Sequence, residues 1–197
     1  MNTTHEYLLA VAAAVASVNP AAVDRLTTLL SRAMLEGRVL LVGGNGGSLA
    51  TVMHFATDLE KCVQAELLFD QQHFPFVPRV HVLGGNTSVL TAWANDDSWN
   101  GALAAQVRAW GEPGGALFLL SASGRSPNLL AAAKAGRDAG LTVVALIGRA
   151  GSPLAALADE ALEMGTEDIQ TAEDVHHVLC HAIFRHLRRI DFHVRPR

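Results

Sequence analysis

Histidine and carboxylate side chains recur at helical spacing in two segments of the chain. His54 and Asp58 lie four residues apart, and near the C-terminus Glu173, His177 and His181 follow one another in steps of four. Residues four apart share one face of a helix, so each segment predicts a stripe of groups suited to binding a metal ion or moving protons. An ordinary surface contact is the competing interpretation of the first pair.

A glycine-rich loop, Gly43-Gly44-Asn45-Gly46-Gly47-Ser48, follows the first apolar run. Glycines let the backbone approach a ligand closely, and the first turn of the next helix offers free N–H groups to an anion. The loop therefore predicts a phosphate site, with a purely steric turn as the alternative. It lacks the third small residue of a dinucleotide-binding loop and the Gly-Lys pair of a Walker loop, which disfavours NAD and ATP.

A serine-rich loop, Leu120-Ser121-Ala122-Ser123-Gly124-Arg125-Ser126, lies in an equivalent place, after an apolar run and before a helix that Ser126 could cap. Hydroxyl groups, a basic side chain and a helix N-terminus can surround a phosphate with donors. Open α/β sheets bind ligands outside the carboxyl ends of their strands, so the two loops support each other as one site.

Alternating short apolar runs and helical patterns must position these loops. The predicted strands are residues 39–42, 79–83, 116–120, 141–147 and 161–164. The predicted helices between and after them are residues 48–63, 87–94, 100–110, 126–139, 152–158 and 171–189. Apolar runs without polar alternation are typical of strands buried on both faces, which predicts an α/β fold with a doubly wound, mostly parallel five-stranded sheet flanked by helices.

Two further helices are expected before the sheet, at residues 4–18 and 20–36, separated by Asn19 and Pro20, which suit a helix start. We expect residues 1–37 to form an N-terminal helical segment packing on the core and on a neighbouring subunit. Residues 38–190 would form the main domain and residues 191–197 a tail.

Composition narrows the class of protein. The chain has 197 residues, of which 50% are hydrophobic and 17% charged, so it can bury a core, and its net charge of −4 offers no basic field for nucleic acid. Cys62 and Cys180 show no pairing pattern, which fits a reduced, cytoplasmic setting. We expect no signal peptide and no membrane-spanning segment.

Several motifs in order resemble one family: the glycine-rich loop, Met53-His54-Phe55-Ala56, Thr91-Ala92-Trp93-Ala94-Asn95-Asp96, the serine-rich loop and the closing Glu-Asp-Val-His helix. From about residue 38 to residue 189, the chain resembles the SIS (sugar isomerase) domain of phosphoheptose isomerases. The resemblance implies a homotetrameric aldose–ketose isomerase. It would convert sedoheptulose 7-phosphate into D-glycero-D-manno-heptose 7-phosphate through an enediol, with one zinc ion per subunit.

The resemblance also assigns residues to roles. Those expected to hold the substrate and its phosphate are Asn45, Gly46, Ser48, Asp96, Ser121, Ser123 and Ser126. Those expected to bind the metal are His54, Asp58, Glu173 and His181. Asp58 matches the position of the general base and His181 that of the general acid, with Glu173 a second candidate for the base.

Departures from the family leave alternatives open. Asp58 stands where the family has Glu, so its carboxylate is one methylene shorter, and Glu173 stands where the family has Gln. Glu173 and His181 are about 12 Å apart along a helix, which makes His177 an alternative ligand, and Gln170 offers another register. The stretch from Cys62 to Pro78 does not match the family's Arg-containing segment, so another sugar phosphate is a candidate substrate. A non-catalytic phosphosugar-binding or protein-interaction module, like the replication-initiator-associating proteins of this fold, is the remaining hypothesis.

Overall fold

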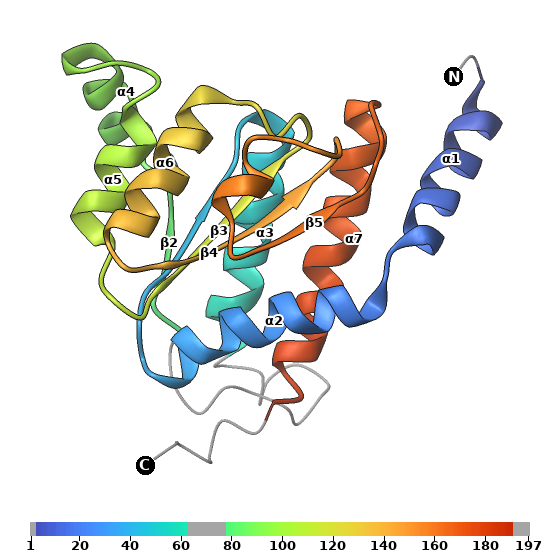
Figure 1. Ribbon diagram of the computed structural model, residues 1–197, viewed down its shortest axis with the longest axis horizontal. Coiled ribbons are helices and arrows are strands. Elements are labelled where there is room, and N and C mark those ends of the chain that lie inside the picture. The colour runs from blue at the N-terminus through green and yellow to red at the C-terminus, as the bar shows by residue number, and fades with distance from the viewer. Residues whose placement is uncertain (1–2, 63–77, 191–197) are drawn as a thin grey trace.

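A computed structural model describes residues 3–62 and 78–190, which form a central sheet covered by helices (Figure 1). The five strands are all parallel and lie in the order β2–β1–β3–β4–β5. In chain order they are β1 (Leu40–Gly43), β2 (Val80–Val82), β3 (Ala116–Ser121), β4 (Thr142–Ile147) and β5 (Glu160–Glu163). The predicted doubly wound α/β fold is confirmed.

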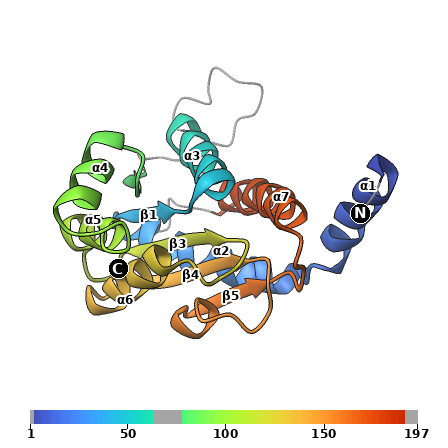
Figure 2. The same ribbon diagram turned by 90° about the horizontal axis from the view of Figure 1, so that it is seen from above.

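The helices pack in two layers, one on each face of the sheet (Figure 2). Five helices connect the strands or follow the last one: α3 (Gly46–Lys61), α4 (Thr87–Asp96), α5 (Ala102–Trp110), α6 (Pro127–Asp138) and α7 (Ile169–Leu187). One apolar cluster joins α2 (Pro20–Leu35), α3 and α7 to the sheet, and a second joins α5 and α6 to its other face. Both faces of the central strands are therefore buried, as the unbroken apolar runs predicted.

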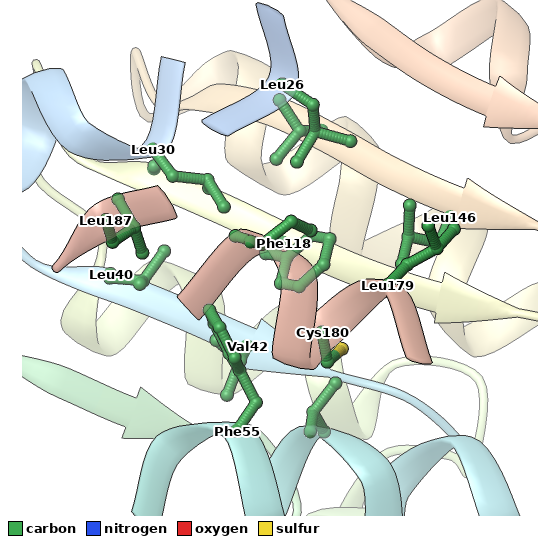
Figure 3. Packing of buried hydrophobic residues seen from close by; sticks show 14 of the residues in the cluster. Leu26, Leu30, Leu40, Val42, Phe55, Phe118, Leu146, Leu179, Cys180 and Leu187 are labelled. Carbon is green, nitrogen blue, oxygen red and sulfur yellow. The ribbon is translucent and has the colours of Figure 1, made fainter. Parts of the chain in front are cut away.

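Strand residues alternate between the two clusters. Leu40, Val42 and Phe118 belong to the cluster under α2, α3 and α7, whereas Leu41 and Leu117 belong to the other. Figure 3 shows the first cluster, in which side chains from α2, α3 and α7 gather around Phe118. Because α3 and α7 share this core, their polar faces are held in a fixed relation above it.

The two N-terminal helices differ in how they pack. α2 begins at Pro20 behind the cap Asn19, as expected, and it buries Leu26 and Leu30 completely in the core. α1 (Thr4–Ser17) begins with a capping box and buries none of its residues. Figures 1 and 2 show α1 standing beside α7, away from the sheet.

One predicted element is wrong. Residues 152–158 form only a short 3₁₀ turn at Ala155–Leu157 instead of an α-helix. The backbone becomes extended at Ala158, and the Asp159 N–H bonds to the carbonyl of Val143 in β4, so the chain enters the sheet before the turn can lengthen into a helix. The predicted tail, residues 191–197, and most of the stretch between Cys62 and Pro78 lie outside the described residues.

Within residues 3–62 and 78–190, no single helix combines the length and apolar character of a membrane span. α1 and α2 reach both only when taken together, across a bend of 70°.

Candidate active site

The two predicted phosphate loops meet at the point where the strand order reverses. β1 and β3 are neighbours, with Gly43 opposite Leu119, while the chain continues from β1 to one edge of the sheet and from β3 to the other. The loops at their carboxyl ends therefore flank a crevice, which is where open α/β sheets bind ligands. The N-termini of α3 and α6 point at this crevice because each helix begins directly after its loop.

A cavity of about 230 Å³ lies between these loops and the start of α7. Its lining includes five of the predicted substrate residues together with one predicted metal ligand: Asn45, Ser48, Ser121, Ser123, Ser126 and Glu173. Gly46 stands at the first position of α3 with φ +52°, a conformation that glycine adopts readily. The structure thus brings five of the seven predicted substrate-binding residues to one cavity.

The serine loop is arranged so that its hydroxyl groups can donate to a ligand. Ser121 Oγ accepts a hydrogen bond from the Gly124 N–H at 3.0 Å, and Ser123 Oγ accepts from the Arg125 N–H at 3.2 Å. Ser126 occupies the cap position of α6, but its side chain makes no capping bond. Since an oxygen that accepts still has its own O–H to donate, these groups suit a phosphate.

Asp96 lies elsewhere. It ends α4, is exposed and accepts a hydrogen bond from the side-chain amide of Asn95 at 2.9 Å. The structure therefore does not bring Asp96 to the lining of the cavity.

Two side-chain amides join the phosphate loops, and one of them was missed in the sequence. The Asn45 amide donates to Asn128 Oδ1 at 3.0 Å, and the Asn128 amide donates to Asn45 Oδ1 at 2.8 Å. Asn128 lies in the first turn of α6, is 2% exposed, and also accepts from the Leu129 N–H. A partly buried reciprocal pair of this kind fixes the glycine loop relative to α6.

The imidazoles of His54, His177 and His181 form a cluster on the facing sides of α3 and α7. One nitrogen atom from each ring lies within 4.8 Å of the other two, and the Nε2 atoms of His54 and His181 are 3.0 Å apart. Asp58 Oδ2 lies 3.4 Å from His54 Nε2 and 3.9 Å from His181 Nε2. The structure thus brings together two helical stripes that the spacing predicted, and His177, weighed as an alternative ligand, is part of the cluster.

The donor set of this cluster fits a zinc ion. Imidazole nitrogens and a carboxylate are common zinc ligands, and ligand atoms around a tetrahedral zinc ion lie roughly 3.3 Å apart. Partial burial, followed by the charges of His181 and His54, lowers the pKa of His177, which favours the neutral ring that binds metals. Nearby on α7, burial raises the pKa of the Cys180 thiol, so it stays protonated in the core.

Glu173 is separated from this cluster along α7. Its carboxylate lies against Gly47 in the first turn of α3, where a Cβ atom would come within 2.6 Å of the Glu173 Cδ. Glu173 therefore lines the cavity between the two loops, one helical turn before His177. His176, on another face of α7, is fully buried, and burial lowers its pKa to about 4.

Known proteins are similar to this chain in sequence and in fold. Residues 5–148 match the SIS domain family. The phosphoheptose isomerase of Mycobacterium tuberculosis is 36% identical over 156 residues, which cover 79% of this chain and 76% of that protein. The phosphoheptose isomerase of Streptomyces coelicolor is 41% identical over 160 residues, which cover 81% of this chain and 64% of that protein.

A solved structure of a phosphoheptose isomerase has the same fold as this chain. The phosphoheptose isomerase of Neisseria gonorrhoeae is 27% identical and aligns with a TM-score of 0.82 over 94% of this chain and 95% of that one. The chain therefore belongs to the SIS domain family, among its phosphoheptose isomerases.

Proposed function

We propose that this protein isomerises sedoheptulose 7-phosphate to D-glycero-D-manno-heptose 7-phosphate. The observation that carries the proposal is that the cavity between the two loops and the imidazole–carboxylate cluster follow one another along α7. Ile169 and Glu173 line the cavity, and His177 and His181 follow in steps of four residues, about 6 Å each. A sugar with its phosphate in the cavity can extend its other end toward the cluster.

The reaction needs a base and an acid near adjacent carbons. A base removes a proton from C1 of the ketose, an enediol forms, and a proton returns to C2 of the aldose, while a second group moves a proton between the two oxygens. Asp58 and Glu173 are the candidate bases, because each is a carboxylate beside the expected path of the sugar. His181 is the candidate acid because its ring lies beside His54 and Asp58 at the exposed end of the cluster, and the ring nitrogen that the ion does not bind would carry the proton.

One zinc ion per subunit is part of the proposal. The residues that would hold it are His54, Asp58 and His181, with His177 in place to contribute a third imidazole and Glu173 the more distant candidate. When bound, the ion supplies a Lewis acid that stabilises negative charge developing on a sugar oxygen.

We also propose a cytoplasmic homotetramer. α1 buries no residue within its own chain, although Leu8 and Leu9 are 60% and 56% exposed. An apolar helix of this kind is stabilised when a second copy covers it. The cytoplasm keeps thiols reduced, which fits the reduced, buried thiols of Cys62 and Cys180.

A substrate panel tests the proposal. Zinc-loaded protein is incubated with sedoheptulose 7-phosphate, fructose 6-phosphate and ribulose 5-phosphate, and the aldose products are measured by NMR. We expect turnover of the heptulose phosphate well above that of the shorter ketoses. Faster turnover of a shorter ketose phosphate would show that this shorter sugar is the substrate. Absence of turnover with zinc bound would favour the non-catalytic phosphosugar-binding module.

A further inference from the structure

Glu173 is an acidic side chain in a cavity that is expected to hold a dianion. The other side chains that line it are neutral hydroxyls, one amide and apolar groups, and no lysine, arginine or histidine of the described ranges 3–62 and 78–190 is among them. Arg125, in the serine loop, is exposed and is not part of the lining. The charge on the cavity wall therefore has the same sign as phosphate.

The position of this carboxylate is built into the fold. Glu173 lies in the interior of α7, and Asp168 caps that helix by accepting from the Thr171 N–H at 2.8 Å. At its other side, the absence of a side chain at Gly47 leaves the space that the Glu173 carboxylate occupies. The carboxylate thus lies against the first turn of α3, at the positive end of the helix dipole. There it offsets part of the positive potential that the helix would offer to a phosphate.

The imidazole cluster supplies the means to offset this charge. His177 stands one turn further along α7 than Glu173, and the cluster also contains the carboxylate of Asp58. Without a cation, the charged side chain that lines the cavity is the Glu173 carboxylate, and Asp58 adds a second carboxylate in the neighbouring cluster. With a divalent cation on the cluster, the negative charge of these carboxylates is offset, and the repulsion of a phosphate in the cavity is reduced.

We propose that Glu173 makes phosphate binding depend on the metal: its carboxylate opposes the phosphate in the metal-free protein, and a divalent cation on the imidazole–carboxylate cluster of α3 and α7 relieves that opposition. The inference rests on the proposed function and deepens it. Coupling between two sites is reciprocal, so phosphate raises the affinity for the cation by the same factor. The enzyme would then bind sugar phosphates mainly in its metal-loaded form.

Calorimetric titration with inorganic phosphate tests the coupling. Wild-type protein is titrated after removal of metal by a chelator, and again after loading with one equivalent of zinc and dialysis. We expect the zinc-loaded protein to bind phosphate about tenfold more tightly, or more, within the usual range of such couplings. Zinc content is measured before and after each titration, so that loss of the ion is detected.

Substitution of Glu173 separates its charge from other effects. Glu173→Gln and Glu173→Ala should each bind phosphate about tenfold more tightly than wild type in the metal-free state, and zinc should then change their affinity far less. Glu60→Gln removes a carboxylate from an exposed position near the other end of α3 and should behave as wild type. It controls for a general change in net charge.

Three results would overturn the inference. Metal-free Glu173→Gln that binds phosphate no more tightly than wild type would show that the carboxylate does not oppose the anion. Tightening in Glu173→Gln but not in Glu173→Ala would assign the gain to a new amide donor instead of the lost charge. Absence of phosphate binding by every form, zinc-loaded wild type included, would overturn the proposed function and this inference with it.

Discussion

The Nε2 atoms of His54 and His181 face each other at 3.0 Å, although 127 positions separate the two residues in the chain. At this distance the two nitrogens either share a proton or bind the same cation. The approach follows from the core beneath them, because α3 and α7 bury their apolar faces in one cluster and so present their polar faces to each other. Asp58, one turn after His54, adds a carboxylate to the same point.

His177 should contribute to zinc binding as His54 and His181 do. We expect His177→Ala and His181→Ala each to lower zinc affinity at least tenfold, because each removes one of three converging imidazoles. Competition with a chromophoric chelator measures the affinity. His186→Ala is the control, since His186 lies on the same helix but pairs with Asp24 at 2.9 Å. An unchanged affinity in His177→Ala would show that His177 is a bystander.

Asn128 should matter both for stability and for phosphate. Asn128→Ala leaves the Asn45 amide without its partner in a partly buried place, so the free energy of unfolding should fall by about 1–3 kcal/mol. The phosphate affinity of the zinc-loaded protein should also fall, because the glycine loop is no longer fixed to α6. Denaturant unfolding and phosphate titration measure the two effects.

Asn86→Ala provides the comparison for Asn128. Asn86 caps α4 by accepting from the Ser88 and Val89 N–H groups, away from the cavity, and its loss should cost about 1 kcal/mol. Phosphate affinity should remain that of wild type. If the two variants changed phosphate binding equally, the amide pair would have no specific role in the site.

Tyr7 should titrate at unusually high pH. Its hydroxyl donates to Asp174 Oδ2 at 2.6 Å, and this hydrogen bond, with burial and the carboxylate charge, raises the pKa of Tyr7 to about 12. Because the folded pKa lies above the ordinary value of 10, the contact stabilises the docked α1 below pH 10 and is lost as the pH rises toward 12. Tyr7 is the single tyrosine of the chain, so phenolate absorbance reports it alone.

Asp174→Asn tests the cause of that shift. Removing the carboxylate charge should move the Tyr7 pKa down toward 10, while circular dichroism verifies that the protein stays folded across the titration. A wild-type midpoint near 10 would show that the α1–α7 contact does not form in solution.

The exposed face of α1 should hold the oligomer together. Leu8→Asp with Leu9→Asp places two charges on a surface that we propose to be covered by another subunit, so the assembly should dissociate into smaller species. Light scattering coupled to size exclusion gives the mass. Since α1 contributes no buried residue to its own chain, the subunit should remain folded. An unchanged mass would place the subunit contact elsewhere.

Local sequence patterns predicted most of the fold. Runs such as Val39–Val42 and Leu141–Ile147 lack polar alternation, and a strand buried on both faces is the structure that tolerates this. Four-residue spacing likewise predicted the stripe of His177 and His181. The sheet order then brought the two phosphate loops together, as expected of loops at strand carboxyl ends.

Contacts between distant elements were beyond such patterns. Helical spacing placed Glu173 on the same stripe as His177, but it carried no information that Glu173 would meet Gly47 of α3. The partner of Asn45 was equally hidden, because Asn128 is 83 positions away and only the adjacency of β1 and β3 brings the two amides together. The resemblance brought Asp96 into the predicted site, whereas it lies at the exposed end of α4.

The most direct test follows hydrogen at C2 of the sugar. Zinc-loaded protein is incubated with sedoheptulose 7-phosphate in D₂O, and NMR detects both the aldose and its isotope at C2. We expect an aldose heptose 7-phosphate with deuterium at C2, because the base that removes the C1 proton exchanges with solvent before returning it. Absence of the aldose in the presence of bound zinc would contradict isomerisation at this site. Formation of the aldose by a variant that lacks His181, Asp58 and Glu173 would contradict it as well.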